Sequence, residues 1–85
     1  MREFSYTITN KYDLAAKPAL DLIKLAGEHD CRTYVVKDNQ VADIKKLFVL
    51  LSLGTQCGET IKFVTEGADE NHAIDRIGNY VTNNM

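Results

Sequence analysis

The hydrophobic period of this chain switches repeatedly along its length, and this restricts the possible folds more than any other feature. In residues 2–9 apolar side chains alternate with polar ones, the period of a strand with one buried face. Over 16–27 the apolar residues recur at intervals of three and four, as on one face of a helix. Pro18 fits the first turn of that helix and Gly27 fits its end. The sequence therefore predicts a strand followed by a helix.

The same two periods assign elements in the second half of the chain. Residues 31–37 are rich in β-branched and aromatic side chains, and a turn-forming run separates them from a short apolar stretch at 41–44, which predicts a hairpin. Residues 60–66 alternate and predict the last strand. Residues 69–83 carry apolar side chains at helical spacing, so we expect a closing helix there.

Another helix is predicted over 45–54, in the stretch KKLFVLLSLG. Gly54 is the stop signal, and the apolar residues before it would lie on nearly every face of the helix. One core face does not need that many hydrophobic side chains. We therefore expect part of this helix to expose an apolar surface.

The expected order of elements is βαββαβα in a single domain, residues 1–85. Because neither repeats nor linker-like runs interrupt this order, the strands should share one sheet. Right-handed crossovers favour a split βαβ arrangement. The predicted fold class is α+β, an open-faced β-sandwich whose four-stranded antiparallel sheet is covered on one face by three helices.

Composition excludes several classes of function. Ten basic and twelve acidic residues give a net charge of −2, so no overall field draws the chain onto nucleic acid or an anionic membrane. The sequence contains neither a secretory signal pattern nor an apolar run that could span a bilayer, and we expect a cytoplasmic protein. Cys31 and Cys57 lack the spacing of a disulfide framework or a zinc site, so we expect reduced thiols, no metal and no cofactor.

The two histidines carry no catalytic motif. His29 lies in GEHDC, at a helix-to-strand turn, and His72 lies in ENHAI, early in the last helix. No carboxylate or hydroxyl partner stands at a motif spacing from either residue. We expect both to be surface or capping residues.

Three stretches resemble the HPr family, the histidine phosphocarriers of the bacterial sugar phosphotransferase system. They are KPA at the first helix start, KKLFVLLSLG, and EGADENHAI at the entry to the last helix. The resemblance covers all 85 residues and implies the same order of elements. It also implies a phosphocarrier-family protein that is not itself an enzyme.

The chain departs from this family where phosphate is carried. The family's first helix starts with an aliphatic residue followed by His-Ala-Arg-Pro-Ala, whereas this chain has Ala15 at the histidine position and Lys17 at the arginine position. A methyl group cannot accept a phosphoryl group. Lys17, with the backbone at Ala16, could retain an anion site at the helix N-terminus, although lysine lacks the bidentate fork of arginine. The alternative is that Lys17 is a solvated residue on the first turn.

The family's regulatory serine position holds Lys46. Lysine cannot be phosphorylated as serine is, and it is unfavourable at the positive end of a helix dipole. Tyr12, Asp13 and Ser52 are the nearest possible substitutes, but Ser52 falls on the far end of the second helix and no activating base flanks Tyr12 or Asp13.

The resemblance implies that a docking surface survives. In HPr the partners meet apolar side chains around the first helix start and along the second helix, positions that here carry Leu14, Leu20, Leu47, Phe48 and Leu51. We therefore expect a monomeric protein-binding or regulatory module, whose partners are phosphotransferase proteins or a transcriptional regulator. Two alternatives remain: a working phosphocarrier whose histidine was removed by engineering, or an HPr fold that binds an unrelated partner. Departures at Asp13, Lys17 and Lys46 favour natural divergence.

Overall fold

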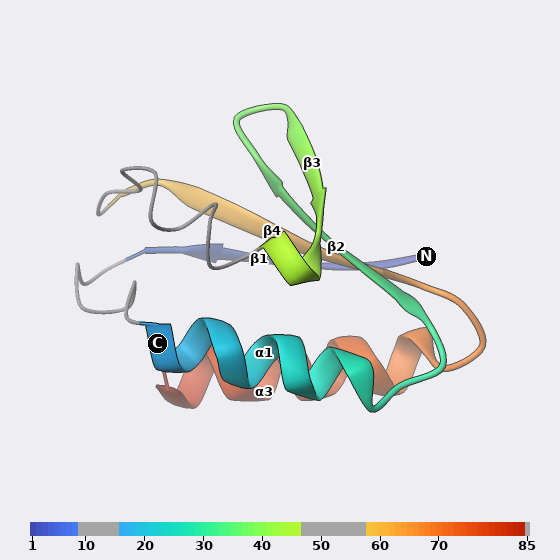
Figure 1. The fold of residues 1–85 in the computed structure, drawn as a ribbon. Coiled ribbons are helices and arrows are strands. Elements are labelled where there is room, and N and C mark those ends of the chain that lie inside the picture. The colour runs from blue at the N-terminus through green and yellow to red at the C-terminus, as the bar shows by residue number, and fades with distance from the viewer. Residues whose placement is uncertain (9–15, 47–57, 85) are drawn as a thin grey trace.

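The computed structural model describes residues 1–8, 16–46 and 58–84, which form one antiparallel sheet with two α-helices packed against one of its faces (Figure 1). The sheet order is β1-β4-β2-β3. The strands are β1 (Arg2–Thr7), β2 (Arg32–Lys37), β3 (Gln40–Asp43) and β4 (Thr60–Glu66), and the α-helices are α1 (Ala16–Gly27) and α3 (Glu70–Asn84). The open-faced α+β fold expected from the sequence is confirmed.

Strand β4 is the centre of the sheet, although it is the last strand along the chain. It pairs antiparallel with β1, where Phe4 lies opposite Phe63, and with β2, where Val35 lies opposite the same Phe63. The chain therefore passes from β1 through α1 to β2 and leaves a slot that β4 later fills. This is the split βαβ arrangement that the sequence predicted.

The core lies between the inner face of the sheet and the two helices. Ile61 and Phe63 of β4 are fully buried, as are Leu22 of α1 and Ile77 of α3. The alternation in each strand and the helical spacing in each helix thus direct their apolar side chains to the same layer. The other members of this buried cluster are Ala19, Leu25, Ala26, Val35, Ile44, Ile74 and Val81.

A polar contact also joins the two helices. The Tyr80 hydroxyl of α3 donates a hydrogen bond to Asp21 Oδ2 of α1 over 2.7 Å. Burial and the neighbouring carboxylate raise the pKa of Tyr80 to about 12. Neither partner could be paired from the sequence, because 59 positions separate them.

The β2–β3 hairpin turns at Asp38 and Asn39, whose φ values are 51° and 67°. Asp and Asn tolerate this left-handed region, which suits a two-residue hairpin loop. After β3, Ile44 does not continue the strand as expected but begins a 3-10 turn, η2 (Ile44–Lys46). The Asp43 carboxylate caps this turn by accepting a hydrogen bond from the Lys45 N–H at 2.9 Å.

The helix expected over 45–54 lies mostly outside the described residues. The described ranges therefore contain two α-helices and one 3-10 turn instead of the three helices expected. Neither α-helix in these ranges is long and apolar enough to cross a bilayer.

The β4–α3 connection packs tightly against the connection that follows α1. Gly67 has a φ of 146°, and a Cβ at this position would lie 2.7 Å from the Cys31 Cα. The Asp69 N–H donates to the Asp30 carbonyl over 3.2 Å, and Thr65 Oγ1 donates to the Glu70 carbonyl over 2.9 Å. These contacts fix where α3 begins.

Replacing Gly67 with a larger residue should therefore destabilise the fold in two ways. The new Cβ would push the two connections apart, and the residue would be strained at this φ. Gly58 is a matched control, because its φ is 93° and a Cβ there would meet nothing within 4 Å among the described residues. We expect Gly58→Ala to cost about 1–2 kcal/mol of unfolding free energy for its backbone conformation. Gly67→Ala should cost at least about 1 kcal/mol more because of overpacking. Equal losses in urea denaturation would contradict the tight approach of the two connections.

The Tyr80–Asp21 contact predicts a dependence of stability on alkaline pH. An unfolded tyrosine has a pKa of about 10, whereas that of folded Tyr80 is raised to about 12. Its stabilising contribution is thus fully present below about pH 10 and is lost as the pH rises through about 12. Absorbance titration of the native protein should show one of its four tyrosines ionising last, and Tyr80→Phe should remove that step. A native wild-type protein in which all four ionise near pH 10 would be inconsistent with this contact.

Candidate functional site

The start of α1 is the first candidate site. The helix begins at Ala16, so the backbone N–H groups of Ala16, Lys17 and Ala19 have no acceptor within the helix. This first turn contains no acidic residue that would neutralise the positive end of the helix dipole. A helix start of this kind can bind an anion, and the anion site expected at Lys17 and Ala16 stays a prediction.

The structure describes only part of the expected docking surface. Leu20 lies on α1 with 59% of its surface exposed, so its side chain is accessible to a partner, although single exposed apolar side chains are common on protein surfaces. Lys46 is exposed at the end of η2. The other docking residues lie outside the described residues; they are Leu14, Leu47, Phe48 and Leu51. Ala15, at the family's histidine position, also lies outside the described residues.

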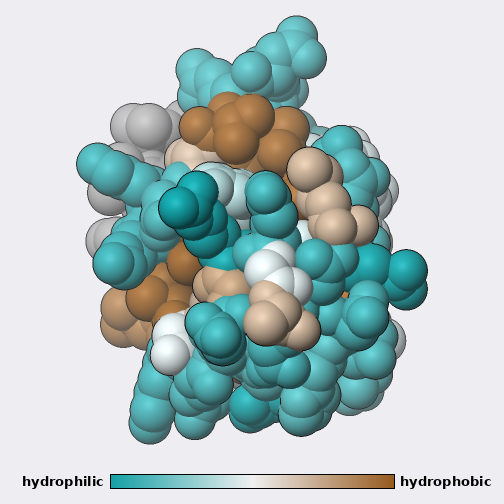
Figure 2. Space-filling view, turned by 90° about the vertical axis from the view of Figure 1, so that its right-hand side faces the viewer, coloured by the Kyte–Doolittle hydropathy of each residue, from teal (hydrophilic) through white to brown (hydrophobic). Residues whose placement is uncertain are grey.

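The end of the molecule opposite the start of α1 has a largely polar surface. It contains the α1–β2 and β4–α3 connections (Figure 1). The face at this end is largely hydrophilic, with separate hydrophobic patches instead of one continuous apolar area (Figure 2).

At this polar end His29 lies in a cluster that the sequence did not predict. Its side chain is only 4% exposed, and its Nδ1 is bonded to the Asp69 carboxylate. Arg76 Nη1 of α3 lies 3.0 Å from His29 Nε2, and Arg76 Nη2 lies 3.3 Å from Glu28 Oε1. The expectation that His29 is a surface or capping residue is therefore wrong. Its partner was missed because Asp69 is 40 positions away in the sequence and reaches it only through folding.

The neighbours of His29 determine which ring nitrogen carries its proton. An arginine guanidinium can only donate hydrogen bonds, so the Nε2 beside Arg76 must be the acceptor. The proton therefore lies on Nδ1, which donates to Asp69. The His29 ring is thus held between the Asp69 carboxylate and the Arg76 guanidinium.

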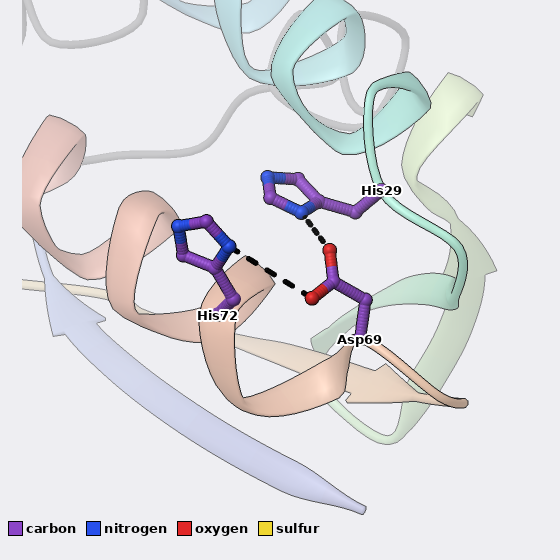
Figure 3. A group of neighbouring side chains, drawn as sticks. All are labelled: His29, Asp69 and His72. Carbon is purple, nitrogen blue, oxygen red and sulfur yellow. Dashed lines mark hydrogen bonds and ion pairs between the residues drawn. The ribbon is translucent and has the colours of Figure 1, made fainter.

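His72 completes this cluster from the first turn of α3. Its side chain is 68% exposed, as the sequence led us to expect, and its Nδ1 lies 3.8 Å from Asp69 Oδ1. The two imidazole rings meet edge to face, with centroids 5.1 Å apart. Figure 3 shows both rings directed at the two oxygens of Asp69. The structure thus brings together two histidines and a carboxylate that the sequence analysis treated as unrelated.

Known proteins and protein families match this chain over nearly its whole length. A family model described as the phosphorylation site of the HPr component of the phosphotransferase system matches residues 2–83. The chain is 30% identical over 77 residues to an HPr-like protein Crh of Halalkalibacterium halodurans, covering 91% of this chain and 92% of that protein. The crystal structure of HPr-C-His from Thermoanaerobacter tengcongensis has a TM-score of 0.80 and 32% identity, covering 96% of this chain and 92% of that one.

One similar protein is much longer. A multiphosphoryl transfer protein of Haemophilus influenzae is 26% identical over 84 residues, and the match covers 95% of this chain. The chain spans only 17% of that protein's length.

The arrangement around His29 predicts its tautomer in metal-free protein. Long-range ¹H–¹⁵N spectra should show the His29 proton on Nδ1, because Arg76 occupies Nε2 as a donor. In Arg76→Met the Nε2 resonance should shift when this hydrogen bond is lost, while the proton stays on Nδ1 beside Asp69. A wild-type spectrum with the proton on Nε2 would contradict the described network.

Proposed function

The chain belongs to the HPr family, and from this premise we propose that it is a protein-binding module of a phosphotransferase system that does not itself carry phosphate. The observation that carries the proposal is Ala15, which stands at the position of the family's phosphorylated histidine. Phosphoryl transfer needs an imidazole nitrogen as nucleophile, and a methyl group supplies none. The protein would bind the partners of a phosphocarrier without accepting their phosphoryl group.

The second phosphorylation position of the family supports the same conclusion. Lys46 occupies the serine position and is exposed at the end of η2. A kinase that reads this position would meet an ammonium group, which is not a phosphoryl acceptor for a serine kinase. In the proposed function, the protein is therefore not regulated by phosphorylation at this position.

Neither described histidine is placed to replace the missing acceptor. His29 is buried, and both of its ring nitrogens are engaged. His72 is exposed but lies in the first turn of α3, at the end of the molecule where α1 finishes (Figure 1). Because α1 has 12 residues, its N-terminus is about 18 Å from that end. A partner aligned on the start of α1 would not reach His72.

The start of α1 would instead contribute to docking. Leu20 offers an exposed apolar side chain one turn into the helix, and in this proposal it is one part of a contiguous apolar patch of the kind that marks interaction sites. The backbone N–H groups of the first turn, which have no acceptor within the helix, and the charge of Lys17 could hold an acidic group of the partner. In this proposal the docking surface also includes Leu14, Leu47, Phe48 and Leu51.

The proposal predicts that the protein cannot be phosphorylated by the enzymes of this system. Intact-mass spectrometry after incubation with phosphoenolpyruvate and enzyme I, and separately with the serine kinase and ATP, should show no gain of a phosphoryl group. Stoichiometric addition of one phosphoryl group would contradict the proposal, and peptide mapping would then test Tyr12, Asp13, Ser52 and His72.

A restored site provides the positive control for this experiment. Ala15→His should accept phosphate weakly, because Lys17 keeps a positive charge without the bidentate geometry of arginine. Ala15→His combined with Lys17→Arg should accept it faster. Equal rates for the two variants would show that lysine is an adequate replacement.

The docking surface predicts separate effects on binding and on stability. Leu20→Ser should change the unfolding free energy by less than about 1 kcal/mol, since the side chain is exposed, but should weaken binding to enzyme I by more than about 1 kcal/mol. Val41→Ser is a matched control, because Val41 is 66% exposed on β3. It should leave binding unchanged in calorimetry.

The buried face of the same helix provides a second comparison. Leu22 is fully buried, so Leu22→Ala should cost about 2–5 kcal/mol of stability.

The comparison of Leu20→Ser with Val41→Ser can also contradict the docking surface. Equal loss of binding in the two variants would show that the described part of α1 contributes no specific docking surface.

A further inference from the structure

We propose that His29, Asp69 and His72 form a binding site for a divalent transition-metal ion of the zinc type, and that Arg76 opposes its loading. The three candidate ligand atoms lie within 4.8 Å of one another. His29 lies in the α1–β2 connection, Asp69 in the β4–α3 connection and His72 in the first turn of α3, so residues distant in the sequence are adjacent in the fold (Figure 3). This inference does not depend on the proposed docking function, because it concerns the opposite end of α1.

The donor set determines the class of ion. Two imidazole nitrogens and one carboxylate oxygen suit Zn²⁺, Ni²⁺ and Cu²⁺, whereas Mg²⁺ and Ca²⁺ prefer sites made of oxygen atoms. Three protein ligands leave a coordination position for water, as in open zinc sites. The exposure of His72 gives the ion a path from solvent.

The distances require only a local adjustment. Zn–N and Zn–O bonds of about 2.0–2.1 Å place the ligand atoms of a tetrahedral site about 3.3 Å apart. Asp69 Oδ1 and His72 Nδ1 are 3.8 Å apart, and no pair in the cluster exceeds 4.8 Å. Because the His72 side chain is 68% exposed, it can rotate toward the other two ligands without disturbing the core.

The backbone that carries these ligands is already fixed. Gly67 lies against Cys31 so closely that a Cβ would not fit. The Asp69 N–H is bonded to the Asp30 carbonyl, and the Ala73 N–H donates to the Asp69 carbonyl over 3.0 Å at the start of α3. A site held on such a framework loses little conformational entropy when it binds an ion.

Arg76 lowers the affinity of the site for a metal ion in two ways. Its guanidinium adds positive charge 3.0 Å from His29 Nε2, and the N-terminus of α3 adds the positive end of a helix dipole. In addition, metal binding at His29 Nδ1 moves the proton from Nδ1 to Nε2, so that the ring stays neutral. That proton would face the Arg76 donor, so Arg76 must withdraw from His29 when the ion binds. Removing Arg76 should consequently tighten binding.

Calorimetric titration of the untagged, reduced full chain with ZnCl₂ tests the proposal. We expect one ion per chain, no binding of MgCl₂, and a loss of zinc affinity of about tenfold or more in His72→Gln. Asp75→Asn is the matched control, because Asp75 is an exposed carboxylate of α3 outside the cluster. It should bind zinc as the wild type does, and Arg76→Met should bind it at least threefold more tightly. Circular dichroism would verify that each variant is folded.

Other results would overturn the site. Absence of zinc binding by the wild type at millimolar concentration would exclude it. Undiminished binding in His72→Gln would assign the ion to other groups, such as Cys31 or Cys57. Equal losses in His72→Gln and Asp75→Asn would show only diffuse attraction to the surface. Weaker binding in Arg76→Met would refute the opposing role of Arg76.

Discussion

The burial of one sheet face beneath two helices is the constraint on which the rest of this structure depends. Leu22 of α1 and Ile77 of α3 meet Ile61 and Phe63 of the central strand β4, and all four are fully buried. Side chains of this size each contribute about 1.5–3 kcal/mol when they leave water. Their packing fixes the antiparallel course of α1 and α3, which places the start of one helix beside the end of the other (Figure 1).

This antiparallel arrangement separates two chemical environments. The start of α1 combines backbone N–H groups that have no acceptor within the helix with the exposed Leu20, and it is where we propose that a partner docks. The start of α3 collects His29, Asp69 and His72 on a tightly packed pair of connections. The phosphocarrier chemistry that the family resemblance implies concerns the first environment, whereas the cluster of His29, Asp69 and His72 lies at the opposite end of α1.

The sequence predicted the fold because each element buries one face, so its period records which residues face the core; the bounds of α1 were predicted at both ends. The polar contacts could not be predicted in this way. His29 finds Asp69 only because β2 and β4 are neighbours in the sheet, and Tyr80 finds Asp21 only because α1 and α3 pack together. Ile44 left its expected strand because the Asp43 side chain competes for the backbone there.

Competition kinetics provide the most direct test of the claim that the chain retains partner binding without a phosphoryl acceptor. The measurement is the rate of phosphoryl transfer from enzyme I to a working HPr at increasing concentrations of this protein. A module that occupies the same docking site raises the apparent KM for HPr and leaves kcat unchanged. A transfer rate that does not change at any concentration of the protein would contradict the account.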